Sequence, residues 1–366
     1  MKVVFIAPLP PPLTGNSLAA KVFYDELLKS HEVELINLNK ESFKSGAGSF
    51  GRLKQIFSIL LKVIKEQKKA DIIYFSISES TMGNIKDLLI YLLCFKKLEK
   101  TFVHMLGGAG MKSILEKKGI QYRLNRFFMS RLSGIIVEGW PQASTFSQII
   151  DKNKIHIVPN FAEDFLFITE AQVRNKYEKI NPLKILFLSN LLYGKGQNEL
   201  VDGYLSLDKD LRDNVKITFI GGFESDIEKQ KFLKKIEGQS GLLYHSAFVS
   251  GEEKKSFYYS SHVFCLPTYY PYEGQPISIL EAYATGCVVI VTEHSGIPQI
   301  FKDALNGFAV EKQSGESIRK TIENICKNKD ILMPIGLTNR NTAFERYRTS
   351  IYGSALLKII NNANQN

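Results

Sequence analysis

The feature that most constrains the fold is a pattern that occurs twice along the chain. Short apolar runs at residues 2–7, 71–77, 101–105 and 134–138 alternate with longer segments of helical periodicity, and a second series begins at residue 183. Apolar runs of this length are typical of strands buried on both faces, and parallel strands joined through helices form doubly wound domains. The sequence therefore predicts an α/β protein with two Rossmann-like domains.

The length of the chain agrees with two domains. A chain of 366 residues with 44% hydrophobic residues is long enough for two separate cores. We expect an N-terminal domain at residues 1–165 and a second domain at 166–343, with a polar, irregular linker around 161–182. Residues 344–366 are expected to form a last helix that packs back on the N-terminal domain.

Residues 272–282, with the sequence YEGQPISILEA, predict a tight loop that runs into a helix. Gly274 allows unusual backbone angles, and Pro276 suits the first turn because its missing N–H would be unpaired there. The N–H groups of residues 277–279 would then lack partners at the positive end of the helix, where a phosphate binds well. A plain loop-to-helix junction without a ligand is the alternative that this local pattern leaves open.

Two carboxylates flank this helix start. Glu273 precedes it and Glu281 follows it, and both are placed to accept hydrogen bonds from hydroxyl groups. Phosphate donors between two hydroxyl acceptors suit a nucleotide sugar.

The net positive charge of the chain comes entirely from its first part. Residues 1–160 contain 23 Lys and Arg and 13 Asp and Glu, a balance of +10, whereas residues 161–366 contain 24 of each. Such asymmetry indicates an anionic partner, either a membrane or a nucleic acid. No helix-turn-helix, zinc or RNA-binding pattern accompanies the charge, so the sequence favours an anionic membrane surface and no nucleic acid.

Three segments of the first domain, residues 52–69, 85–100 and 112–131, combine apolar stripes with Lys and Arg. The first fits a helix lying on an anionic membrane surface, or a core-facing helix with a solvated basic face. Three such segments in one domain favour membrane contact. No apolar run approaches the roughly 18 residues of a membrane span. The N-terminus is unlike a signal peptide, and the four cysteines show no paired spacing that would indicate disulfides. We therefore expect a cytoplasmic protein, peripheral at the inner face of the cell membrane.

Several other motifs carry little weight. The Asp208-Lys209-Asp210 triplet matches an Asp-x-Asp metal motif but lies in a charged stretch, which favours a solvated turn. The six histidines show no metal spacing, and no phosphate loop or nucleophile elbow is present. We expect no metal, hydrolase or NTPase site and no cofactor. His104, at a strand end before a glycine-rich loop, could face a cleft or belong to the core.

The order of the motifs is similar to that of a known family. Residues 273–281 closely resemble the Glu–seven residues–Glu motif of glycosyltransferase family four, and the loop that ends in Lys195-Gly196 resembles its Lys-Gly loop. Further similar segments are ATGCVV at 284–289, SGIPQI at 295–300, NGF at 306–308 and VPN at 158–160. This resemblance implies a GT-B fold, with two doubly wound domains facing each other across a cleft. It also implies retaining, metal-independent transfer from a nucleotide sugar.

The resemblance assigns roles to individual residues. Glu281 would hold the ribose hydroxyls and Glu273 the donor sugar, while Lys195 and the amides after Gly274 would hold the diphosphate. The implied catalytic residues are Glu273, His104 and Lys195. The implied donor-binding residues are Gly15, Asn190, Lys195, Phe248, Val249, Glu273, Gly274, Gln275, Pro276, Ile277 and Glu281.

Some of these assignments have a particular basis. Gly15 would let the first-domain loop approach the donor, and His104 would face the sugar. Asn190 stands where many family members have an Arg on the diphosphate, which shifts more of that charge to Lys195. Phe248 and Val249 are the expected base pocket.

The sequence thus predicts a glycosyltransferase of hexosyltransferase type, with a UDP-sugar favoured as donor and a lipid-linked or oligosaccharide acceptor, in bacterial surface-polysaccharide assembly. Replacing Glu281 by Ala is expected to abolish transfer while leaving folding intact. The alternatives are another GT-B enzyme, such as a nucleotide-sugar epimerase or an inverting transferase, and a non-catalytic basic scaffold at the membrane.

Overall fold

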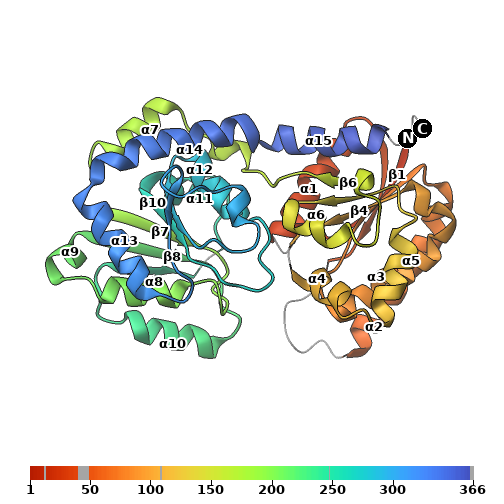
Figure 1. Cartoon of the computed structure of the whole chain (residues 1–366), viewed down its shortest axis with the longest axis horizontal. Coiled ribbons are helices and arrows are strands. Elements are labelled where there is room, and N and C mark those ends of the chain that lie inside the picture. Colours follow the sequence, from red (N-terminus) through yellow and green to blue (C-terminus); the bar gives the residue numbers. More distant parts are fainter. Residues whose placement is uncertain (12–13, 40–48, 108, 247, 363–366) are drawn as a thin grey trace. The chain divides into compact units, whose positions relative to one another are not determined.

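The computed structural model describes residues 1–11, 14–39, 49–107, 109–246 and 248–362. Its contacts divide the chain into two compact units (Figure 1). Unit 1 consists of Met1–Asn160 and Ser350–Asn366, and unit 2 consists of Phe161–Thr349.

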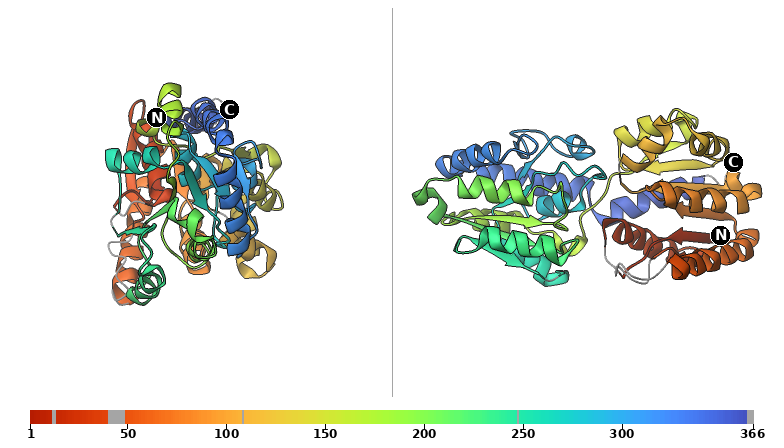
Figure 2. Two further views of the ribbon diagram at one scale, coloured as in Figure 1. Left: turned by 90° about the vertical axis from the view of Figure 1, so that its left-hand side faces the viewer. Right: turned by 90° about the horizontal axis from the view of Figure 1, so that it is seen from below.

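Unit 1 is built on a six-stranded sheet with the order β2-β1-β3-β4-β5-β6, in which each neighbouring pair is parallel. Its strands are β1 (Lys2–Ala7), β2 (Glu32–Asn37), β3 (Ile72–Ser76), β4 (Thr101–Met105), β5 (Gly134–Val137) and β6 (Ile155–Ile157). Strands β1, β3, β4 and β5 are almost entirely buried, as their uninterrupted apolar sequences predict, because helices cover both faces of a doubly wound sheet (Figure 2).

The helices of unit 1 lie between successive strands along the chain, except the last one, which comes from the C-terminal end. They are α1 (Gly15–Leu28), α2 (Ser49–Glu66), α3 (Thr81–Leu93), α4 (Ala109–Glu116), α5 (Ile120–Met129), α6 (Trp140–Phe146) and α15 (Thr349–Asn362). The prediction of a single helix at residues 112–131 is wrong. The chain breaks there into α4 and α5, because Lys118 adopts a positive φ of 47° and Gly119 caps the second helix.

Unit 2 repeats this architecture with the order β12-β11-β10-β7-β8-β9, and each neighbouring pair is again parallel. Its strands are β7 (Leu183–Leu188), β8 (Val215–Ile220), β9 (Leu242–His245), β10 (Val263–Leu266), β11 (Val288–Val291) and β12 (Gly307–Ala309). The α/β class with two doubly wound parallel sheets is therefore confirmed.

The helices of unit 2 include α7 (Glu170–Tyr177) and α9 (Lys209–Asp213), which form where the sequence predicts a linker and a turn. The others are α8 (Gln197–Leu205), α10 (Asp226–Ile236), α11 (Gly251–Ser260), α12 (Ile277–Ala284), α13 (Gly315–Lys327) and α14 (Leu332–Arg346). Residues 161–182 are not an irregular linker, because Thr169 and Gln172 form a capping box that starts α7. Val173 and Tyr177, one turn apart, bury the inner face of this helix in the core of unit 2.

The last helix also differs from the expectation. Residues 344–360 belong to two helices, α14 and α15, which are separated by Tyr347 and Arg348. Helix α15 lies almost wholly in unit 1, where Gly353 faces Glu26 and the ring of His31 contacts the side chain of Asn361.

Candidate functional site

The loop before α12 is held in place by the loop after β11. The N–H of Gly296 donates to the carbonyl of Gly274 at 3.2 Å, and the hydroxyl of Ser295 donates to the carbonyl of Glu273. A Cβ on Gly296 would lie 2.7 Å from the Gly274 oxygen, so only glycine permits this approach. The predicted loop-to-helix junction is therefore a packed structure with a fixed course.

Helix α12 begins directly after Pro276, which has no side-chain cap to offer. In the described part of the chain, the N–H groups of Ile277 and Ser278 have no acceptor, whereas the N–H of Ile279 donates to the carbonyl of Pro276 at 3.2 Å. Two amides, rather than the three expected, are available at the positive end of the helix. They can still bind an anion.

Lys195 and Glu273 form an ion pair beside this helix. The ammonium of Lys195 lies 3.0 Å from Oε1 and 2.8 Å from Oε2 of Glu273, and the Thr268 hydroxyl donates to Oε2 at 2.8 Å. The ammonium also lies 4.8 Å from the centre of the Tyr270 ring. The two side chains are only 13% and 8% exposed, so their attraction is weakly screened by solvent.

Two glycines give Lys195 this position. Gly194 and Gly196 both have φ of 91°, a left-handed conformation that glycine adopts without strain. A Cβ on Gly196 would lie 2.5 Å from the Pro267 carbonyl oxygen, so the lysine loop runs directly against the end of β10. The family resemblance implies separate contacts for Lys195 and Glu273, but neither their mutual pairing nor the participation of Thr268.

Glu281 has a different set of partners. It is 2% exposed, and its carboxylate accepts hydrogen bonds from the ammonium of Lys254 and, at 3.0 Å, from the hydroxyl of Tyr258. Lys254 also donates to Glu163 at 3.0 Å. Burial lowers the pKa of Lys254, but attraction to Glu281 and Glu163 outweighs burial and raises that pKa above its usual value. Lys254 is therefore a cation held by two carboxylates.

Lys254 was not predicted as a site residue from the sequence. The residue lies within Glu252-Glu253-Lys254-Lys255, a run of charges that is typical of a solvated helix end. Only the packing of α11 shows that this lysine is buried while Glu252 and Glu253 are exposed and Lys255 is half-buried.

The remaining unit 2 residues lie in varied surroundings. Gly274, Gln275 and Pro276 are buried in the loop before α12. Val249 is also buried, whereas Phe248 and Asn190 are exposed. The donor contacts expected for Asn190, Phe248 and Val249 stay predictions.

Gly15 and His104 lie in unit 1. Gly15 is exposed in the first turn of α1, which begins after the capping residue Thr14, so it is not part of the preceding loop as expected. His104 has no exposed surface, and its Nδ1 lies 2.6 Å from the Tyr74 hydroxyl. Burial lowers the pKa of His104 to about 3, so its ring is neutral at physiological pH. These surroundings are those of a core histidine, the second alternative that the sequence left open.

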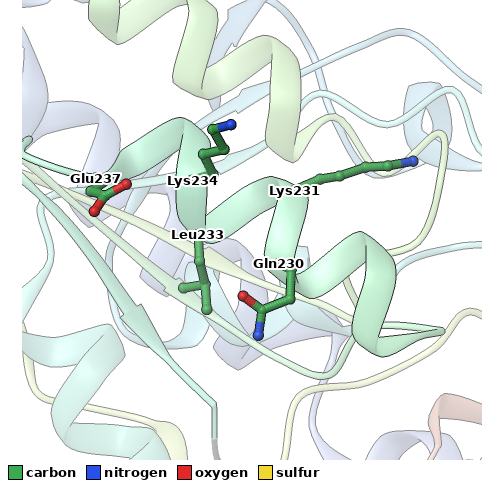
Figure 3. A pocket seen from close by; sticks show the side chains of 5 residues that line it. All are labelled: Gln230, Lys231, Leu233, Lys234 and Glu237. Carbon is green, nitrogen blue, oxygen red and sulfur yellow. The ribbon is translucent and has the colours of Figure 1, made fainter.

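A surface hollow of about 600 Å³ lies along α10 and contains no predicted site residue (Figure 3). Its lining residues are Gln230, Lys231, Leu233, Lys234 and Glu237. In the part of the chain that the structure describes, no three His, Cys, Asp or Glu side chains gather in a way that could hold a metal ion.

The second unit matches a known family model. Residues 169–341 match Glycosyl transferases group 1, and this range contains all of the predicted unit 2 site residues. A capsular polysaccharide biosynthesis glycosyltransferase, CapH of Staphylococcus aureus, is 30% identical over 177 residues, which are 45% of this chain and 48% of that protein. An amylovoran biosynthesis glycosyltransferase, AmsK of Erwinia amylovora, is 24% identical over 49% of this chain and 44% of that protein. The chain thus spans about half the length of these curated relatives.

Solved structures resemble the chain over its whole length. Alr3699/HepE of Anabaena, solved in complex with UDP, has a TM-score of 0.74 at 13% identity and covers 99% of this chain and 100% of its own. WaaG, a glycosyltransferase involved in lipopolysaccharide biosynthesis, has a TM-score of 0.69 at 15% identity, with 98% of both chains covered. At such identities the likeness shows the fold. The Glu–seven residues–Glu motif and the family match assign residues 169–341 to Glycosyl transferases group 1, and the two parallel sheets give the whole chain the GT-B fold of the solved structures.

Proposed function

We propose that the chain is a retaining, metal-independent glycosyltransferase that uses a nucleotide-sugar donor, with a UDP-sugar favoured. The observation that carries this proposal is the ion pair of Lys195 and Glu273 beside the free amides of α12. A cation and a helix N-terminus can hold a diphosphate and stabilise the charge of the departing nucleotide, while a carboxylate can accept hydrogen bonds from sugar hydroxyls. The acceptor is a lipid-linked or oligosaccharide chain in surface-polysaccharide assembly, as the names of the capsular and amylovoran relatives suggest.

A donor screen tests this function. UDP-, GDP- and ADP-sugars are each added to the protein without divalent cations, and the melting temperature is recorded. A donor at a hundredfold excess over its Kd is expected to add about 2.7 kcal/mol to the free energy of unfolding, which raises the melting temperature by several degrees. The absence of any shift and of any sugar transfer would overturn the proposal. An inverted anomeric product would overturn its retaining part.

We also propose that unit 1 docks on an anionic membrane surface through three neighbouring helices. Helix α3 contacts both α2 and α5, and each leaves a row of apolar side chains in solvent. These exposed residues, here called the apolar face, are Phe57, Leu61 and Ile64 on α2, Met82, Ile85, Leu89 and Leu92 on α3, Phe95 after α3, and Ile120, Leu124 and Phe127 on α5. Within each helix they recur every three or four residues, so they lie on one side of it.

Cations border the apolar face. Lys62 and Lys65 on α2 and Arg123 and Arg126 on α5 are exposed. Apolar side chains that enter the headgroup region and cations that attract anionic lipids are the two components of peripheral membrane binding. No described helix is long and apolar enough to cross a membrane. The side chains of Arg52 and Leu53, which the sequence analysis placed in the same segment, lie outside the described residues.

The double variant Ile85→Glu/Leu92→Glu tests the apolar face. Both positions are exposed, so folding is expected to persist, while cosedimentation with phosphatidylglycerol-containing vesicles falls at least tenfold as two charges enter the contact region. The matched control is Ile227→Glu/Leu243→Glu, which places the same change on exposed positions of unit 2 and should leave vesicle binding unaltered. Wild-type protein that binds no such vesicle at low salt would refute membrane docking and leave the transferase proposal standing.

A further inference from the structure

Lys254 is a buried charge that the donor chemistry described above does not use. It is 6% exposed on α11, and its ammonium donates to Glu281 and to Glu163. Tyr258 lies one turn later on the same side of α11 and donates to the other oxygen of Glu281 at 3.0 Å. Two residues of one helix therefore hold both oxygens of one carboxylate.

Burying the charge of a lysine at this position is unfavourable in free energy. Taking two charges out of water costs free energy, and an apolar pair of similar size is often as stable as a buried ion pair. Packing alone therefore does not account for a cation between Glu281 and Glu163. Its specific effect, together with Tyr258, is to fix the orientation of the Glu281 carboxylate.

We infer that Lys254 is a positioning residue for the ribose of the nucleotide donor, and this inference rests on the proposed function. Lys254 and Tyr258 each occupy one acceptor position on Glu281, and a carboxylate offers about four. The remaining positions can accept hydrogen bonds from the 2′ and 3′ hydroxyls of ribose, with the carboxylate already oriented. Because ribose is common to UDP, GDP and ADP, this contact would be independent of the base.

A second buried lysine provides a matched control. Lys176 on α7 is also buried, but its ammonium donates to the carbonyls of Tyr258 and Thr285 and to the sulfur of Cys287, with no carboxylate among these partners. Its role is to satisfy acceptors in the core. Replacing Lys176 disturbs the same region of unit 2 without changing the charge beside Glu281.

The experiment measures the affinity of Lys254→Met for UDP and for 2′,3′-dideoxy-UDP by calorimetry. Wild-type protein is expected to bind the dideoxy nucleotide about ten- to a hundredfold more weakly, because hydrogen bonds to a charged group are lost. In Lys254→Met the UDP affinity falls and the two nucleotides bind within about threefold of each other, because a disordered Glu281 no longer distinguishes them. Lys176→Met, whatever its stability, is expected to keep the wild-type ratio of the affinity for UDP to the affinity for 2′,3′-dideoxy-UDP.

Tyr258→Phe is a milder second variant, which removes one hydroxyl and keeps the ring in the core. It is expected to reduce the ratio of the two nucleotide affinities less than Lys254→Met does. A Lys254→Met protein that keeps the full wild-type ratio would overturn the inference while leaving the transferase proposal intact, as would a wild-type protein that binds both nucleotides equally. Wild-type protein that binds no nucleoside diphosphate would instead overturn the proposed function itself.

Discussion

Replacing Lys195 by Met is expected to lower kcat/KM for the nucleotide-sugar donor by about 10²- to 10³-fold, the usual effect of removing one preorganised group that stabilises developing charge. The ammonium pairs with Glu273, which shortly precedes the free amides of α12, and the departing nucleotide gains negative charge as the sugar leaves. Methionine keeps much of the aliphatic length but provides no charge. Steady-state transfer with the donor selected by the thermal screen measures the effect.

Two further variants make this result specific. Lys231→Met removes an exposed lysine from the hollow along α10, where it pairs with Glu228, and should leave transfer unchanged (Figure 3). Glu273→Gln should also lower transfer, but its affinity for UDP should be retained or increased, because the carboxylate no longer competes with the diphosphate for Lys195. Weaker UDP binding by Glu273→Gln would contradict this competition. Full activity of Lys195→Met would show that Lys195 does not contribute to transfer.

Replacing Glu281 by Ala is expected to lower the free energy of unfolding by about 3 kcal/mol as well as to abolish transfer, because it leaves the buried ammonium of Lys254 without its closest carboxylate. From the sequence alone, loss of transfer with intact folding is the expected result. The ion pair with Lys254 changes that expectation. Urea denaturation of the variant and of wild-type protein measures the difference.

The double variant Glu281→Leu/Lys254→Met separates the two effects. With both charges gone, most of the stability should return, because an apolar pair does not have the cost of a lone buried charge. Transfer should stay lost, because leucine cannot accept hydrogen bonds from the donor. If the double variant is no more stable than Glu281→Ala, the unpaired charge of Lys254 does not account for the lower free energy of unfolding.

Much of the fold could be predicted because its strands are buried on both faces. The runs at residues 183–188, 215–220 and 263–266 are apolar almost throughout, and each is a strand of unit 2. Helix α7 escaped prediction for the opposite reason. Only two of its apolar side chains, Val173 and Tyr177, are buried, and the third buried residue is Lys176, so its sequence looks like a polar linker. The break between α4 and α5 depends on the backbone of Lys118, which the charge pattern does not reveal.

The sequence by itself determined the two parallel sheets, the helix start after Pro276 and the family, because these depend on local apolar runs and on one contiguous motif. Only the tertiary structure decided which charges meet. Strands β7 and β10 are neighbours and parallel, so the loops at their carboxyl ends come together and join Lys195 to Glu273, 78 residues later. The packing of α11 likewise brings Lys254 to Glu281. Such pairs arise from distances in space, which the order of residues along the chain does not contain.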